Sequence, residues 1–228
     1  MSVGHALDPL DSTGAISGMA ALTGSSAFHE HMVRVVHDTS SFREIAATAQ
    51  AHHNSFKKYV LAQMPGLKLV LHVWELPENL ESVDTHNHRW NFVSRVYAGE
   101  LEAYSFRDGP PGPDTFTEYQ YASPNGAEDF EMLPTRTARL ETIDRNAYRA
   151  GDIYAQPFEE IHRARPTQSG TITLIAEGAV MQRSTRVFGS GLDHIAARSI
   201  VRSIQRPDVG TVRADLIRFV SVLEESAQ

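Results

Sequence analysis

Two histidines separated by a single residue, His86 and His88, precede a long run of strand-forming residues. Side chains at positions i and i+2 of a strand point to the same face of a sheet, so this pair can direct two imidazoles to one point. Imidazole nitrogen is a good ligand for Fe(II), Zn(II) and similar ions. A third histidine, His162, follows another predicted strand, and inward-facing residues of a small barrel converge on its axis. The three side chains therefore predict a metal site; the alternative is that they are ordinary structural and surface histidines.

The composition restricts the ligands that such a site can use. The 228-residue chain has no cysteine, which excludes thiolate ligands, disulfides and a cysteine nucleophile together. Any metal must therefore be held by imidazole, carboxylate or water. The chain has 11 histidines, so some histidines close in sequence are paired by chance.

The elements that must position these histidines are mostly short strands. About nine of them, at a spacing of roughly 8–12 residues, predict an all-β sandwich or barrel. The predicted strands are Leu67–Glu75, Trp90–Ala98, Glu100–Arg107, Thr115–Tyr121, Ala138–Tyr148, Gly151–Gln156, His162–Arg165, Thr171–Glu177 and Val180–Phe188.

Helices are predicted on both sides of the strands. Ser41 as N-cap and Glu44 at the third helical position form a capping box, and helical spacing continues to Phe56 past His52 and His53. Thr211 is the predicted cap of a C-terminal helix. Its apolar stripe comprises Val212, Leu216, Phe219, Val220 and Leu223.

We therefore expect three parts: an N-terminal lead-in with helices (1–60), a barrel (66–188) and a C-terminal helical extension (189–228). The segment 108–134 is rich in proline and glycine and interrupts the barrel. Such an insertion is expected to be a lid over the barrel mouth or a dimer contact.

The bulk charge excludes several classes of function. A net charge of −7 and a sequence pI near 5.9 argue against nucleic-acid binding, which needs a basic patch. Apolar runs are too short to span a membrane, and residues 1–20 lack the pattern of a secretory signal. The expected location is the cytoplasm.

Two stretches carry a resemblance to a known family. From Gly151 to His162 the spacing is glycine, five residues, Pro157, one residue, Glu159, two residues and histidine. This is similar to the second motif of the cupin superfamily, and His86 to Gly99 resembles the first. The resemblance implies a double-stranded β-helix, a small jelly-roll barrel. It also implies that His86, His88 and His162 hold the metal.

The chain departs from the usual first motif, which places a glutamate ligand where Phe92 and Val93 stand. This favours a three-histidine site and resembles the iron dioxygenases of the cysteine dioxygenase type. In those enzymes an arginine that binds the substrate carboxylate precedes the equivalent of Leu67–Trp74, where this chain has Lys57 and Lys58. These lysines, with Trp90 as an apolar wall, are the predicted substrate-binding residues.

Three further residues are predicted to act at the metal. Tyr154 and Gln156 share one strand face just before the third histidine, and Arg95 lies within the first motif. A tyrosine could donate a hydrogen bond to bound oxygen, and an arginine could orient a carboxylate.

The resemblance implies an Fe(II) oxidoreductase that inserts oxygen from O2 into a small anionic metabolite. Two alternatives stay open: a lyase, isomerase or hydrolase using Zn(II), Mn(II) or Ni(II) at the same site, or a cupin that binds a ligand without turnover. The expected partners are a small-molecule substrate, O2 and a second copy in a homodimer, with no nucleic acid and no membrane.

Overall fold

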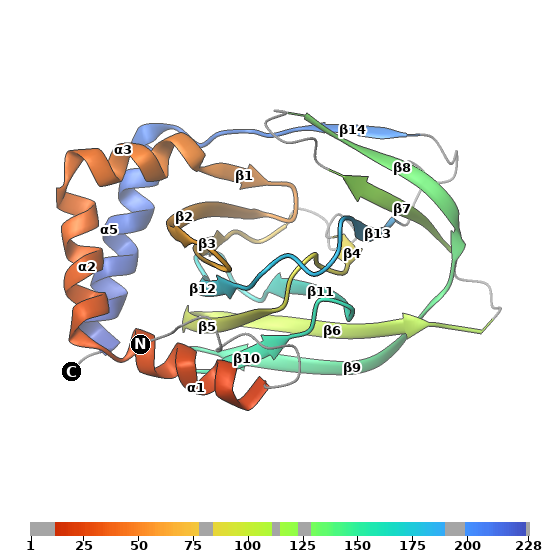
Figure 1. Ribbon diagram of the computed structural model, residues 1–228, viewed down its shortest axis with the longest axis horizontal. Helices are drawn as coiled ribbons and strands as arrows, with labels where there is room; N and C mark the ends of the chain where they lie inside the picture. The colour runs from red at the N-terminus through yellow and green to blue at the C-terminus, as the bar shows by residue number, and fades with distance from the viewer. Residues whose placement is uncertain (1–11, 78–83, 111–114, 123–128, 190–198, 227–228) are drawn as a thin grey trace.

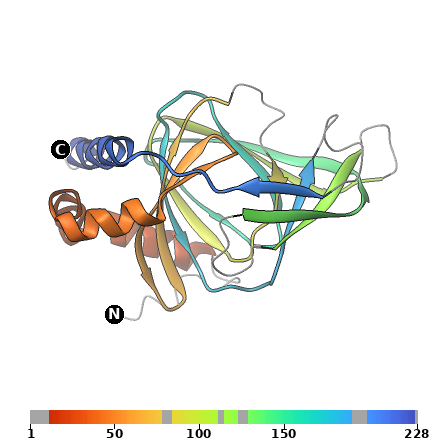
Figure 2. The ribbon, with the colours of Figure 1, turned by 90° about the horizontal axis from the view of Figure 1, so that it is seen from above.

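Two antiparallel sheets face each other, and helices cover the outer side of one of them (Figures 1 and 2). The computed structural model describes residues 12–77, 84–110, 115–122, 129–189 and 199–226. The strands come from the β-branched and aromatic runs of the middle of the chain, as their composition favours.

The first sheet has six strands and is the one that the helices cover. Its order is β1 (Gln50–His52), β2 (Phe56–Met64), β3 (Leu67–Trp74), β12 (Ile172–Glu177), β5 (Phe92–Ala98) and β10 (Ile153–Gln156). Alternation along β3 separates its two faces: Leu69, Leu71 and Val73 pack with the helices, whereas His72 and Trp74 line a cavity inside the barrel.

The second sheet has eight strands. Their order is β14 (Ile200–Ser203), β8 (Asp129–Ala138), β7 (Phe116–Ala122), β13 (Thr185–Gly189), β4 (Thr85–His86), β11 (Ile161–Pro166), β6 (Glu100–Asp108) and β9 (Leu140–Arg149). The predicted insertion 108–134 thus contains β7 and most of β8. These strands extend the second sheet beyond β13, and Tyr121 and Met132 from them line the cavity.

The strand order is that of a jelly roll. Counted along the chain, β3, β4, β5, β6, β9, β10, β11 and β12 are its eight strands. The first sheet holds the first, eighth, third and sixth of them as neighbours, and the second sheet holds the second, seventh, fourth and fifth. This is the double Greek-key arrangement of a jelly roll. The predicted fold class, a mainly β jelly-roll barrel with N-terminal helices and a C-terminal helix, is confirmed.

Four helices are found in the described residues: α1 (Ser12–Thr23), α2 (Ser26–His37), α3 (Thr39–Thr48) and α5 (Val209–Ser226). They gather at one end of the molecule against the six-stranded sheet (Figure 2). The largest apolar core lies between the helices and this sheet. It includes Met32, Phe42, Leu71, Val93, Leu216 and Phe219.

The helix boundaries differ from the prediction. Asp38, not Ser41, is the N-cap of α3, because its carboxylate accepts a hydrogen bond from the Ser41 backbone N–H at 2.7 Å. The helix ends at Thr48, and His52 and Phe56 lie in β1 and β2. Pairing of β1 with β2, and of β2 with β3, fixes the backbone there. The sheet thus begins at Gln50, inside the range expected for the N-terminal part.

The N-cap of the C-terminal helix also lies three residues before the predicted one, Thr211. Asp208 accepts from the Thr211 N–H at 2.9 Å, so α5 begins at Val209. The predicted apolar stripe is buried at Val212, Leu216, Phe219 and Leu223, within the core that the chain forms with itself. Because these residues are buried within one chain, the stripe gives no support to the homodimer, which stays a prediction.

Candidate metal centre

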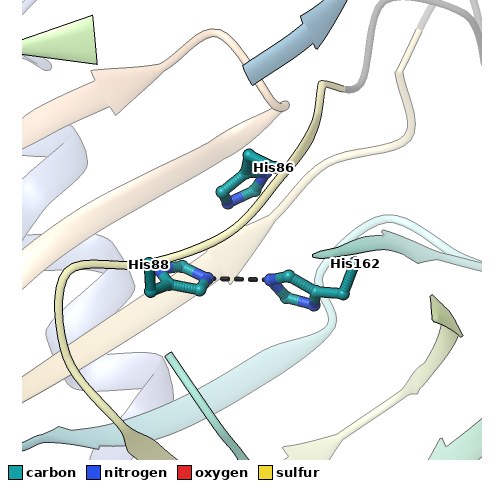
Figure 3. A group of neighbouring side chains, drawn as sticks. All are labelled: His86, His88 and His162. Carbon is teal, nitrogen blue, oxygen red and sulfur yellow. Dashed lines mark hydrogen bonds between the residues drawn. The ribbon is translucent and has the colours of Figure 1, made fainter. Parts of the chain in front are cut away.

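Three histidines from two parts of the chain point toward one another inside the barrel (Figure 3). His162 lies on β11 directly opposite His86 on β4, and His88 stands two residues after His86. The Nε2 atoms of His88 and His162 are 2.7 Å apart, and the three potential ligand atoms lie within 4.8 Å of one another. Nitrogen atoms that share one ion at about 2.1 Å are spaced by about 3 to 4 Å. The observed separation of 2.7 Å and the upper limit of 4.8 Å bracket this spacing, so the group is compact enough to hold a single ion.

His88 does not lie in a strand, contrary to the prediction. Only Thr85–His86 pairs as β4, and the chain then turns toward β5. Backbone contacts hold this turn: the His88 N–H donates to the Phe158 carbonyl at 3.1 Å, and the buried Asn87 side chain accepts from the Arg186 N–H at 2.7 Å. The loop, rather than strand alternation, brings His88 to the same point as His86.

One hydrogen bond fixes the orientation of His86. Its Nδ1 lies 3.0 Å from the Asp84 carbonyl oxygen, which can only accept. The proton of a neutral ring is therefore on Nδ1, and Nε2 keeps its lone pair for a metal. Such a second partner is usual for a metal-binding histidine.

The electrostatic surroundings also suit metal binding. Removal from bulk water lowers the pKa of His88 and His162 well below the ordinary histidine value, and it lowers the pKa of His86 as well. All three rings are therefore neutral, which is the form that binds metals. The donor set suits Fe(II), Zn(II) or Ni(II), so the residues fit the metal that the sequence predicts.

Within the described part of the chain, the cluster contains the three histidines and no carboxylate. Phe92 meets the His88 ring edge-on at 4.9 Å, and Val93 faces the helices. Two other carboxylates of the barrel region are engaged elsewhere: Glu102 pairs with two arginines, and Glu75 pairs with Lys57. The structure thus has the expected cluster of three histidines.

The histidines open onto a cavity of about 670 Å³. Its wall is partly aromatic, with Phe56, Trp74, Trp90, Phe92 and Tyr154 among the lining residues. A cavity of this size takes a small molecule, and apolar walls with a few polar groups are typical of ligand sites.

The structure separates the three predicted catalytic residues. Tyr154 lines the cavity, where its ring stacks on Tyr148 at 4.1 Å. Gln156 follows it on the same face of β10 and is buried, but it does not line the cavity. Arg95 lies on the helix side of β5, where its Nη1 donates to the Thr23 hydroxyl at 2.6 Å. It is therefore not placed to act at the histidines.

The predicted substrate-binding residues are also divided. Lys58 and Trp90 line the cavity. Lys57, the preceding residue of β2, points to the other face and contacts Glu75 and Asp215 at 3.0 Å each. Adjacent strand residues face opposite sides, so only one of the two lysines can reach the site.

Several cavity residues were not singled out from the sequence, among them Lys68, His53, Asp84 and Glu177. One pattern could have revealed Lys68: it shares strand parity with His72 and Trp74, inside an otherwise apolar run.

No family model matches the chain, and no curated protein matches it. Among solved structures, KdgF from Halomonas sp. is 13% identical over 57% of this chain and 85% of its own, with a TM-score of 0.35. The hydroxypropylphosphonic acid epoxidase from S. wedmorenis is 14% identical over 54% of this chain and 50% of its own, with a TM-score of 0.34. A cupin-2 domain containing protein from Shewanella frigidimarina is 14% identical over 54% and 79%, with a TM-score of 0.30.

The fold itself rests on the strand order described above, together with the histidines on its inner face. The chain has the jelly-roll fold that the resemblance to cupins implies. Its resemblance to the cysteine dioxygenase type stays a prediction. No helix in the described ranges is both long and apolar enough to cross a membrane.

Proposed function

We propose that this cupin-type chain is a metal-dependent enzyme that oxidises a small anionic metabolite with O2 at an Fe(II) site held by His86, His88 and His162. The observation that carries the proposal is the convergence of three neutral imidazoles, with no carboxylate among them, on the cavity. Three neutral ligands leave the ion its full double positive charge, so an anionic substrate is favoured beside it. When bound, Fe(II) supplies the O2 chemistry.

The chain's own residues would bind and shield the substrate. Trp90 and Phe92 line the cavity next to His88, with ring centroids 6.2 and 4.9 Å from its own, and they exclude water there. Burial raises the pKa of Tyr154 to about 12. Its phenol therefore stays protonated and can donate a hydrogen bond to a group in the cavity.

A second candidate function uses the same histidines without O2. Three histidines with an open position are also a catalytic zinc set, in which the metal activates water or polarises a carbonyl. A lyase, isomerase or hydrolase on Zn(II), Mn(II) or Ni(II) is therefore the alternative, and a cupin that binds without turnover is the non-enzymatic one.

The test is metal analysis of protein purified without added metal, followed by O2 uptake with candidate carboxylates and phosphonates. Iron with substrate-dependent O2 uptake supports the proposal, and zinc with no uptake overturns the oxidative part. The single variants His86→Ala, His88→Ala and His162→Ala should each lose the metal. His37→Ala, at an exposed position of α2, is the matched control and should keep it.

A further inference from the structure

The inner face of the six-stranded sheet carries a second polar cluster, which the metal site does not use. It comprises Lys58 on β2, Lys68 and His72 on β3, and Glu177 on β12, and all four side chains line the cavity. Lys58 is the cross-strand partner of His72, and Lys68 is the partner of Glu177. Cross-strand partners point to the same face of a sheet, so the four groups form one patch.

The patch has an excess of positive charge. The buried Glu177 carboxylate contacts Lys58 Nζ at 3.0 Å and Lys68 Nζ at 2.5 Å. Both ammonium groups, and the Arg89 guanidinium, also lie over the Trp90 ring, at 6.0, 5.2 and 5.1 Å from its centroid. Two ammonium groups thus share one carboxylate, and a third cation, Arg89, lies over the same Trp90 ring. Because each ammonium carries three N–H donors, the contact with Glu177 leaves donors for a second anion.

His72 is the other unusual member of the patch. It is only 8% exposed, and neither of its ring nitrogens has a hydrogen-bond partner within the described residues. The ring is held in place by Phe56, which stacks on it at 4.1 Å, and by the edge of Trp74 at 5.8 Å. A buried polar group without a partner is costly, so its partner is expected to enter with a ligand.

Burial, with the charges of Lys58 and Lys68, lowers the pKa of His72 well below the ordinary histidine value. His72 is thus a neutral donor with two ammonium groups as its nearby charges. Trp90 connects this patch to the metal centre, because the His88 ring lies 6.2 Å from it while both lysines lie over it.

We propose that Lys58, Lys68 and His72 form an oxyanion subsite, which binds a carboxylate or phosphoryl group of the molecule that reaches the three histidines. Only the link between the bound anion and the three histidines rests on the proposed function. Glu177 is a positioning residue that holds the two ammonium groups together. Lys57 takes no part, because its contacts are on the opposite face of the sheet.

The chain offers its own reporter for the test. Its only two tryptophans, Trp74 and Trp90, both line the cavity. Intrinsic fluorescence of the full chain, with and without chelator treatment, would be titrated with inorganic phosphate and with malonate. Saturable binding is expected for at least one probe. The probe that binds tighter identifies the anion as phosphoryl or carboxylate.

Lys58→Met and Lys68→Met should each weaken that binding at least tenfold, because they remove the charge and keep the apolar stem. Lys57→Met, the adjacent residue on the opposite face, is the matched control and should change the dissociation constant less than twofold. Equal effects at positions 57 and 58, or no effect at 58 and 68, would overturn the subsite.

Two further measurements complete the test. If the methionine variants fail to fold, His72→Phe is used instead, because it alters no ion pair and retains the stacking on Phe56. Unchanged affinity for both probes in His72→Phe also overturns the proposal. Anion binding that persists in His86→Ala after the metal is lost separates the two hypotheses. In that case the oxyanion subsite stands even if no metal enzyme is found. If the chain retains its metal but binds neither anion, the metal site stands and the oxyanion subsite is overturned.

Discussion

His162 and His86 are direct cross-strand partners, although 75 residues of sequence lie between them. The pairing of β11 with β4 therefore places two of the three imidazoles by backbone register alone. A register shift of one residue would turn one of the rings to the outer face of the sheet. The metal centre is thus tied to the jelly-roll topology, and His88 is added to it by a loop.

Metal removal should lower stability by a predictable amount. An ion that binds only the folded chain stabilises it by about 2.7 kcal/mol at a free concentration of one hundred dissociation constants. Calorimetric melting with the bound metal and with a chelator should therefore show a lower Tm after chelation. His162→Ala should melt at one temperature in both conditions, while the exposed-site control His37→Ala should keep the difference. A chelator-sensitive Tm in His162→Ala would contradict this assignment.

Asn87→Ala should loosen the turn that carries two of the ligands. The Asn87 side chain is 3% exposed, and it accepts from the Arg186 backbone N–H at 2.7 Å. Loss of this buried hydrogen bond should cost about 1–2 kcal/mol of unfolding free energy and weaken metal retention. Urea denaturation and metal analysis measure the two effects. The control Asn146→Ala removes an exposed contact to Asp144 and should change stability by less than about 0.5 kcal/mol.

Much of the site could be predicted because its chemistry is local in sequence. His86 and His88 are close neighbours, and the spacing from Gly151 to His162 is a motif in itself. Phe92 and Val93 at the positions of a fourth ligand correctly indicated a cluster without a carboxylate. The strand runs from Leu67 to Glu177 were recognisable from their β-branched and aromatic residues.

The wrong predictions concern which face of a strand a side chain occupies and which residue caps a helix. The resemblance assigns both Lys57 and Lys58 to the place of one arginine. Adjacent strand residues face opposite sides of a sheet, so only Lys58 reaches the cavity. Arg95 was expected inside, but Phe92 and Val96 face inward from β5, which directs Arg95 toward the helices. At both misplaced helix starts an aspartate three residues earlier, Asp38 or Asp208, is the cap.

Glu102 should make stability depend on acid pH. Hydrogen bonds from Arg145 and Arg165 hold the pKa of Glu102 at about 2, below its ordinary value of 4.5. A carboxylate with a depressed folded pKa contributes stability that is complete above the unfolded pKa and is lost as pH falls through the folded one. The unfolding free energies of the chain and of Glu102→Gln should therefore differ by a constant amount above pH 4.5 and converge toward pH 2.

Urea titrations at several pH values measure this difference. Glu141→Gln breaks a more exposed pair with Arg107 and provides the control, with a near-zero difference at every pH. A Glu102→Gln difference that stays constant down to pH 2 would show that the two arginines do not stabilise the folded state through this carboxylate.

Tyr154→Phe should lower turnover without removing the metal. The Tyr154 ring is 7% exposed, stacks on Tyr148 and meets Phe92 at 6.3 Å, and all these contacts survive the loss of the hydroxyl. Only the hydrogen bonds of the hydroxyl, which interacts with Ser94, change. We therefore expect kcat to fall by about 10–100-fold while metal content and Tm stay within error. Because the pKa of Tyr154 is about 12, the rate should show no loss from its ionisation up to pH 10. Tyr104→Phe, whose hydroxyl contacts Glu102 outside the cavity, is the control. Equal kcat values for the two variants would remove Tyr154 from the reaction.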